Sequence, residues 1–174
     1  QIFSGGLVAG IDAGTAYNEW PLMNGQVLPD ESFDLLPIWI NFFHNSALVQ
    51  FNHRILGYLL FFLVLIFFII AKYDTNPAIK RSSFYLIFVA TFQVCLGIIT
   101  ILSEAELLYA ALHQAGGMIF LIFGMMLQSN DWLVFFKLAF IGFFLFITGP
   151  TATHALARAA LSEQSIKDST ESTI

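Results

Sequence analysis

Three apolar stretches, each long enough to cross a lipid bilayer, run through the middle of the chain. They cover residues 46–71, interrupted only by Asn52-His53-Arg54, then residues 82–103 and residues 107–130. About 20 apolar residues span the hydrocarbon core of a bilayer. Lipid leaves the backbone of an open strand without hydrogen-bond partners, so each stretch is expected to be a helix. The pattern therefore predicts three membrane-spanning helices.

Residues 1–13 form a shorter apolar segment ahead of these spans. They cannot cross a bilayer alone, and we expect them to be the end of a helix whose start lies upstream. Gly6, Gly10 and Gly14 recur at four-residue spacing. Such a stripe of small residues lets a neighbouring membrane helix approach closely. The segment therefore predicts a truncated first helix that packs through its glycines.

Residues 131–160 form a further apolar segment behind the three spans. Pro150 is expected to kink or end the helix that begins at Trp132, because proline removes a helical hydrogen bond. His154 and Arg158 follow on one helix face and are interpreted as interfacial residues. Residues 161–174 are rich in Ser, Thr and charge, which predicts a disordered tail.

Loop charges predict how the helices are oriented. Residues 72–81 hold three basic side chains, whereas residues 15–45 and the Glu104-Ala105-Glu106 turn hold none. Short loops rich in Lys and Arg stay on the cytoplasmic side of a membrane. Residues 72–81 are therefore expected to be cytoplasmic, and the other two connections are expected to lie outside.

Composition agrees with an all-α, multi-pass integral membrane protein whose solvent is membrane lipid. Hydrophobic residues make up 57% of the chain and charged residues 11%, and 20 of its residues are Phe. No basic patch suggests nucleic acid as a partner. The single cysteine, Cys95, excludes an intramolecular disulfide and is interpreted as a packing residue.

Two histidines stand out because an imidazole is costly to bury in lipid. His53 is seven residues into the first span and His113 is six into the third, so both are expected roughly 10 Å below the outer helix ends. Gly57 and Gly117 follow each histidine by four residues, on the same helix face and one turn deeper. A bare surface beside each ring suits a flat ligand, which predicts that the pair are the axial ligands of one heme.

Other interpretations of these polar residues remain open. The histidines could instead serve packing or proton relay, and a zinc ion would need further ligands near by. Arg54 could pair with a heme propionate, or its side chain could reach to the interface. His44 is interpreted as an exposed loop residue. The amides in or near the spans are expected to hydrogen-bond between helices, with some supporting the ligands; they are Gln50, Asn52, Gln93 and Gln114.

Five segments in order resemble the heme A synthase family over about residues 1–128. They are Gly6-Leu7-Val8-Ala9-Gly10-Ile11-Asp12-Ala13-Gly14, Tyr17-Asn18-Glu19-Trp20-Pro21-Leu22-Met23, Val49-Gln50-Phe51-Asn52-His53-Arg54, Gln93-Val94-Cys95-Leu96-Gly97-Ile98 and Leu112-His113-Gln114-Ala115-Gly116. The resemblance implies an eight-helix enzyme made of two four-helix halves, each with a histidine pair, that oxidises a methyl group of heme O to the formyl group of heme A. Residues 1–130 resemble its second half, a four-helix transmembrane bundle with a truncated first helix, followed here by an extra C-terminal helix.

In that half the resemblance implies a bound heme b, with His53 and His113 as its two ligands. The six-coordinate iron would suit electron transfer from an unknown donor toward the half that holds heme O. Because the substrate half is absent from this sequence, the chain is expected to be an oxidoreductase fragment that is inactive alone. The resemblance implies a bacterial-type plasma membrane with the histidine pair near its outer face, and a homo-oligomer is left open.

A weaker resemblance concerns residues 132–160. Residues 144–160 are similar to the C-terminal end of the G-type component of monovalent cation/proton antiporters, which indicates a segment of different origin joined near residue 130. The alternative function is therefore a non-enzymatic membrane component of such an antiporter, in which the histidines serve as proton or packing sites. An inert fragment is a third interpretation.

Overall fold

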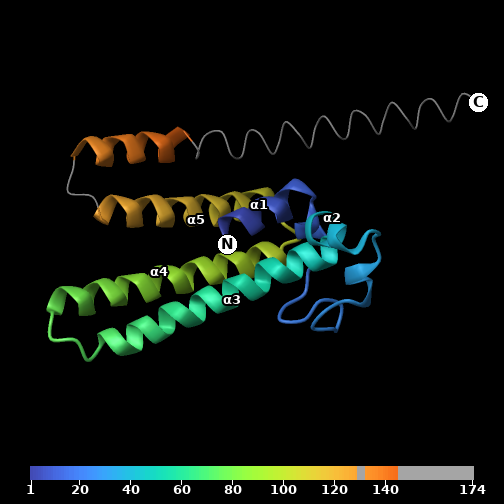
Figure 1. Ribbon diagram of the computed structural model, residues 1–174, viewed down its shortest axis with the longest axis horizontal. Coiled ribbons are helices and arrows are strands. Elements are labelled where there is room, and N and C mark those ends of the chain that lie inside the picture. The colour runs from blue at the N-terminus through green and yellow to red at the C-terminus, as the bar shows by residue number, and fades with distance from the viewer. Residues whose placement is uncertain (129–131, 145–174) are drawn as a thin grey trace, which may run out of the picture. The chain divides into compact units, whose positions relative to one another are not determined.

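Helices make up most of the structure, a computed structural model that describes residues 1–128 and 132–144 (Figure 1). These residues contain no β-strand, and one isolated backbone bridge pairs Met23 with Gln26. The chain divides into two compact units, residues 1–120 and residues 121–174. The predicted all-α class is confirmed for the described part of the chain.

Two long antiparallel helices, α3 (Ser46–Ala71) and α4 (Pro77–Leu102), form the centre of the first unit and lie side by side in Figure 1. Each begins at an asparagine whose side-chain oxygen accepts a backbone N–H: Asn45 caps α3 and Asn76 caps α4. The first predicted span agrees with α3. The second was predicted to start five residues too late, because Asn76 followed by proline at the first helical position starts α4 at Pro77.

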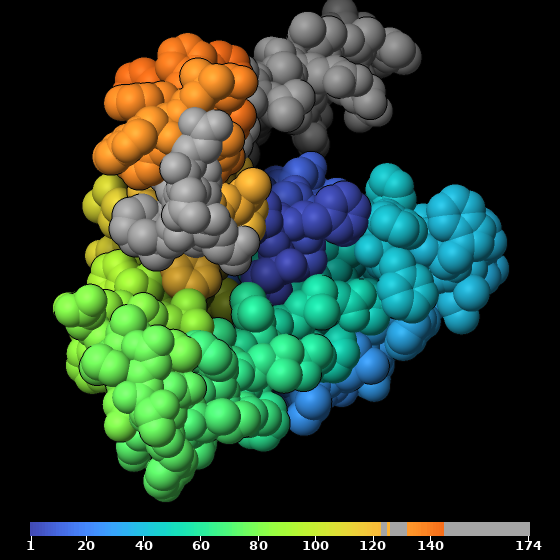
Figure 2. Space-filling model, turned by 60° about the vertical axis from the view of Figure 1, so that its left-hand side comes forward, coloured from blue at the N-terminus to red at the C-terminus, as the bar shows by residue number. Residues whose placement is uncertain are grey.

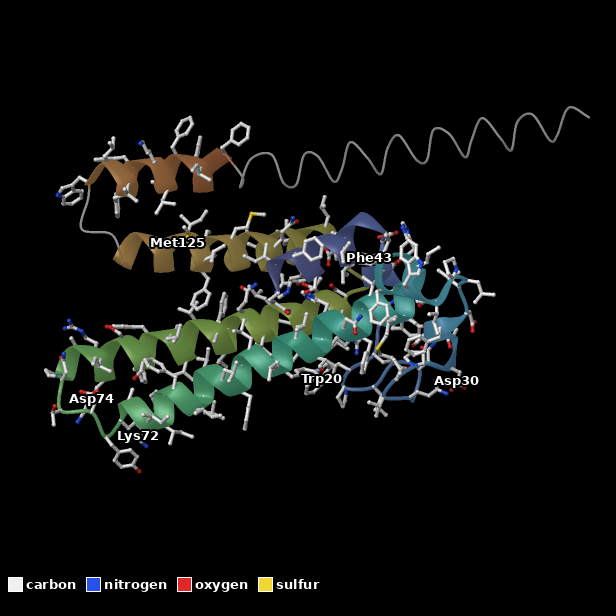
Figure 3. The ribbon with its side chains drawn as sticks, viewed as in Figure 1. Trp20, Asp30, Phe43, Lys72, Asp74 and Met125 are labelled. Atoms are coloured by element: carbon white, nitrogen blue, oxygen red, sulfur yellow. The ribbon has the colours of Figure 1, made fainter. Side chains whose placement is uncertain are left out.

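The basic residues at this end of the hairpin were therefore placed partly in the wrong element. Lys80 and Arg81 lie in the first turns of α4, so the connecting loop is only residues 72–76. Figure 3 shows Lys72 and Asp74 at this end of the hairpin and Asp30 and Phe43 at the other. The three basic side chains still gather at a single end of α3 and α4.

Apolar side chains cover the outside of both long helices. Over the most apolar 18 residues of each helix, 11% of the positions are buried in α3 and none is buried in α4. A core helix of a water-soluble protein buries its apolar face instead. The exposed apolar surface therefore fits helices that face lipid.

The short helix α1 (Ile2–Gly10) packs on α3, but not through the predicted glycine stripe. A Cβ atom at Gly6 or Gly10 would meet no atom within 4 Å, whereas one at Gly5 would lie 3.1 Å from the His53 ring. Gly14 lies outside α1, in the 3₁₀ helix η1 (Ala13–Thr15), where it approaches Ala105. The packing face of α1 is therefore one residue away from the predicted one.

Residues 16–45 form a compact connection at the end of α3, seen as the blue and cyan surface of Figure 2. It contains η2 (Asp30–Phe33), η3 (Ile38–Ile40) and α2 (Asn41–His44). Tyr17 and Met23 pack with Ala47 of α3 in a small apolar core. The Asn45 side-chain amide donates to Glu31 O (2.7 Å) and to Asn41 Oδ1 (3.1 Å), which fixes this connection to the start of α3.

The third predicted span is α5 (Leu107–Gln128), which follows a tight turn in which Glu104 and Ala105 have positive φ. Its predicted end at residue 130 lies outside the described residues. In the second unit, Trp132–Phe144 is a short apolar helix. The expectations for Pro150, His154, Arg158 and the tail at 161–174 also fall outside the described residues.

We expect Asn45→Ala to destabilise the chain more than Asn76→Ala. Either substitution removes a helix cap, which costs about 1 kcal/mol. The Asn45 change also removes two hydrogen bonds to residues 31 and 41, each worth about 1 kcal/mol. Thermal unfolding in detergent, followed by circular dichroism, measures the difference. An equal loss for both variants would contradict this account.

Candidate functional site

The two predicted ligand histidines come together from different helices. His53 lies on α3 and His113 on α5, and their ring centroids are 6.4 Å apart with the ring planes at 86°. Both side chains are partly buried. The pairing brings two imidazoles to one place in the first unit, which is the arrangement that two axial ligands require.

The spacing of the rings suits a metal held between them. A metal bound by one nitrogen of each imidazole at about 2.0–2.1 Å puts the ring centroids roughly 6–6.5 Å apart. Among the described residues, no group of three or more His, Cys, Asp or Glu side chains could hold a metal ion. A site with two protein ligands fits iron that a porphyrin already holds by its four nitrogens, and fits structural zinc poorly.

His53 is held by the first turn of α1. Ser4 Oγ donates to Gln1 O (2.8 Å) and lies 3.0 Å from His53 Nδ1, so the hydroxyl oxygen can accept the Nδ1 proton. Gln1 Nε2 donates to His53 O (3.2 Å) and lies 3.3 Å from His53 Nε2. With the proton on Nδ1, the lone pair is on His53 Nε2, where it accepts from the Gln1 amide in this structure.

His113 is held in a similar way by α4. Gln93 Nε2 donates to His113 O (2.5 Å) and lies 3.1 Å from His113 Nδ1. A Cβ atom at Gly97 would lie 2.8 Å from His113 Cε1, so only glycine lets the ring lie so close to the α4 backbone. The ring is therefore fixed between a side-chain amide and a bare stretch of helix.

The two glycines one turn beyond the histidines lie against these same amides. A Cβ atom at Gly57 would lie 3.1 Å from Gln1 Nε2, and one at Gly117 would lie 3.5 Å from Gln93 Nε2. Each glycine thus leaves room beside its histidine, which the sequence pattern assigned to a porphyrin. In the structure the group that uses this room is a glutamine side chain.

Arg54 is buried and hydrogen-bonded to the connection at residues 16–45. Its two Nη atoms donate four hydrogen bonds, of 2.9–3.1 Å, to three backbone carbonyls and to Gln50 Oε1. The carbonyls belong to Tyr17, Glu19 and Leu22. Arg54 Nε is buried and has no partner among the described residues, and none of these partners is a carboxylate. The cation therefore fixes the loop and retains one unused N–H and an uncompensated charge.

The remaining predicted polar residues have different surroundings. Gln50 is fully buried and donates to Ala13 O (3.0 Å) and Tyr17 O (3.2 Å), as expected of an interhelical amide. His44 is exposed at the end of α2, as predicted. Sequence reasoning missed Ser4, Gly5 and Gly97 as neighbours of the histidines. Their signal was the pattern Gln-x-x-x-Gly, which occurs at Gln1 and again at Gln93.

A tyrosine and a glutamate interact within the connection at residues 16–45, away from the histidines. Tyr17 Oη donates a short hydrogen bond to Glu31 Oε1. Burial, followed by this hydrogen bond and the charge of Glu31, raises the pKa of Tyr17 from 10.0 to about 12. The same bond lowers the pKa of Glu31. Both residues line an open hollow of about 450 Å³ that includes none of the predicted heme-site residues.

We expect Arg54→Met to release the connection at residues 16–45. It leaves the carbonyls of Glu19 and Leu22 without a donor among the described residues and removes one of the two donors to Tyr17 O. Each buried acceptor left unpaired costs roughly 1–3 kcal/mol. Limited proteolysis in detergent should then cut within residues 15–45 much faster than in the wild-type chain. Lys72→Met, at the other end of α3, is the matched control. A wild-type cleavage pattern in Arg54→Met would refute this role.

The Tyr17–Glu31 pair predicts a pH dependence. The raised Tyr17 pKa means that its contribution to stability is complete below pH 10 and is lost as the pH rises toward about 12. The lowered Glu31 pKa gives a contribution that is present above its ordinary 4.5 and is lost as the pH falls through the folded value. In an ultraviolet titration, Tyr17→Phe should remove the highest tyrosinate step. Glu31→Gln should lower that step only part of the way, because burial is its larger cause.

Comparisons with known proteins agree on one family. The COX15-CtaA family model, described as cytochrome oxidase assembly protein, matches residues 1–125. This match does not favour the antiporter interpretation drawn from residues 132–160. No solved structure matches the chain.

Curated relatives carry the name heme A synthase. The relative from Ruegeria sp. (strain TM1040) is 43% identical over 66% of this chain and 30% of its own length. The one from Bartonella bacilliformis is 40% identical over 72% of this chain and 36% of its own length. The one from Rhizobium etli (strain CFN 42) is 45% identical over 71% of this chain and 34% of its own length. The chain thus spans about a third of these relatives, and the length of the family match shows that it belongs to the COX15-CtaA family of cytochrome oxidase assembly proteins.

Proposed function

We propose that this chain is the cofactor-heme half of a heme A synthase and holds heme b between His53 and His113. The observation that carries the proposal is the 6.4 Å separation of the two ring centroids, which a metal between two imidazole nitrogens requires. When bound there, the heme would supply one-electron transfer. His53 and His113 are the residues that would hold it.

The surrounding residues have supporting roles in this proposal. Ser4 Oγ accepts a hydrogen bond from His53 Nδ1, which leaves the ring lone pair on Nε2, the nitrogen that the Gln1 amide meets and that a heme would take from it. Arg54 places a buried positive charge next to His53 in the chain and has one unused N–H, which favours the carboxylates of a heme on that side. The space that Gly57 and Gly117 leave beside the rings is occupied here by the Gln1 and Gln93 side chains.

The helices α1, α3, α4 and α5 are proposed to form the four-helix transmembrane bundle around this site. The loop at residues 72–76 would face the cytoplasm, because the basic residues gather there. The connection at residues 16–45, at the other end of α3, would lie outside, with the histidine pair near that face. A bacterial plasma membrane is the proposed location, since the relatives reported above are bacterial.

The reaction of the complete enzyme needs more than this chain. With the remaining two thirds of its relatives' length, the chain would serve the oxidation of a heme O methyl group to the formyl group of heme A. This half would pass electrons from a donor toward the half that holds the substrate. Alone, the chain is proposed to bind heme without turning over heme O.

We expect His53→Ala and His113→Ala each to abolish the visible spectrum of a six-coordinate low-spin heme in the purified chain loaded with heme b. Each change removes one of two axial ligands. His44→Ala is the matched control, because His44 is exposed in the outer connection and should leave the spectrum unchanged. An unchanged bis-histidine spectrum in His113→Ala would sink the proposal.

A further inference from the structure

We propose that Gln93 and Gln1 are positioning residues that orient the His113 and His53 rings, and that the first unit repeats this arrangement in two helix pairs. In each pair, one helix carries Gln-x-x-x-Gly and the other carries His-x-x-x-Gly. The inference rests on the proposed function only in taking heme as the ligand that the oriented rings receive. The contacts between glutamine and histidine stand without it.

The pair formed by α4 and α5 shows the arrangement most clearly. Gln93 and Gly97 are four residues apart and lie on one face of α4. The Gln93 amide reaches both His113 O and His113 Nδ1, at 2.5 and 3.1 Å. Gly97 lies against the other side of the same ring, at Cε1. An imidazole held at one ring nitrogen and packed at Cε1 cannot rotate freely.

The pair formed by α1 and α3 repeats the backbone contact and the glycine contact, but its glutamine meets the other ring nitrogen. Gln1 Nε2 donates to His53 O at 3.2 Å and lies 3.3 Å from His53 Nε2, whereas Gln93 meets Nδ1 of its histidine. A Cβ atom at Gly5 would lie 3.1 Å from His53 Cε1, the same ring atom that Gly97 approaches on His113. Two histidines from different helices are thus held by the same residue types at the same spacing.

The glycine four residues after each histidine leaves room for the glutamine amide to reach the histidine. Within an α-helix the histidine carbonyl faces the residue four positions later, so a side chain there would cover it. Gly57 lies against Gln1 Nε2 and Gly117 against Gln93 Nε2, while a Cβ atom at Gly116 would clash with Gln93 Oε1. The His-x-x-x-Gly pattern therefore admits a glutamine to the carbonyl and to the ring together.

This contact bears on ligation because a metal-bound imidazole is tuned by what its second nitrogen meets. In His113 the second nitrogen is Nδ1, which the Gln93 amide meets, whereas in His53 it is Nδ1 beside Ser4, because Gln1 meets Nε2. Hydrogen bonds to the second nitrogen fix the tautomer and the ring orientation, and removing such a partner typically weakens metal binding about 10–100-fold. Two rings that must face each other 6.4 Å apart gain from being fixed separately. An ordinary interhelical hydrogen bond would stabilise the bundle without affecting either ring.

The test compares Gln93→Leu with Gln114→Leu in the full chain. Gln114 is the residue after His113, and no hydrogen bond to its side chain is found among the described residues, so its substitution controls for losing an amide from the bundle. Three measurements are made: NMR of isotope-labelled histidine ring nitrogens without heme, the electron paramagnetic resonance signal and midpoint potential with heme b, and the rate of heme loss to apomyoglobin.

Gln93→Leu should move the ring-nitrogen signals of His113 but not those of His53. It should also shift the low-spin resonance signal and the potential and speed heme loss about 10–100-fold, whereas Gln114→Leu should do none of these. Unchanged ring-nitrogen signals in a folded Gln93→Leu chain would overturn the positioning role. A wild-type chain without a low-spin heme signal, together with moved His113 signals, would instead overturn the proposed function alone.

Glycine substitutions keep the idea testable if Gln93→Leu does not fold. Gly5→Ala should push the His53 ring and change its signals, because the added methyl group would lie 3.1 Å from Cε1. Gly6→Ala, the next residue, should leave both rings unchanged, because its methyl group would enter open space. Equal effects of the two substitutions would count against the ring-packing role of Gly5.

Discussion

A polar ring among apolar helices needs hydrogen-bond partners, and this constraint organises the first unit. His53 and His113 lie on helices whose outer surfaces are otherwise apolar. An unpartnered polar group in such surroundings costs several kcal/mol. Ser4 and Gln1 supply partners to the His53 ring, and Gln93 supplies one to the His113 ring. Hydrogen bonds to the two imidazoles therefore join α1 to α3 and α4 to α5.

Arg54, a second buried polar side chain, needs partners too, and it finds them in the connection at residues 16–45. Next to His53 in the chain, this guanidinium binds three loop carbonyls and the Gln50 amide. Those bonds fold residues 17–22 over the start of α3, and Asn45 fixes the later part of the connection to the same helix end. Consecutive residues of α3 thus hold the loop, through Arg54, and carry the His53 ring.

The sequence predicted what depends on periodicity and length, and missed what depends on tertiary contacts. The spans, their helical nature and the meeting of His53 with His113 followed from hydrophobicity and from equal positions along two helices. The early start of α4 at Pro77 was missed because charge was given more weight than the Asn76 cap. The role of Gly5 in place of Gly6 and Gly10 depends on how α1 is rotated against α3, and four-residue spacing alone does not fix that rotation. Arg54 was expected either to pair with a heme propionate or to reach to the interface; it binds loop carbonyls instead, and that loop has no periodic pattern to reveal its path.

The two histidine settings also differ in one respect that bears on how a shared metal would be held. Ser4 accepts from His53 Nδ1, whereas the matching position on α4 is Leu96, and His113 Nδ1 meets the Gln93 amide instead. A hydroxyl whose own proton is given to Gln1 O can only accept from the ring, which fixes the tautomer of His53. The Gln93 NH2 group also donates to His113 O, which can only accept, so a half-turn of this amide would set two acceptor oxygens against each other. His113 Nδ1 is therefore left to accept from Gln93, and the two neutral rings are set in opposite tautomers, with the ring proton on Nδ1 of His53 and on Nε2 of His113.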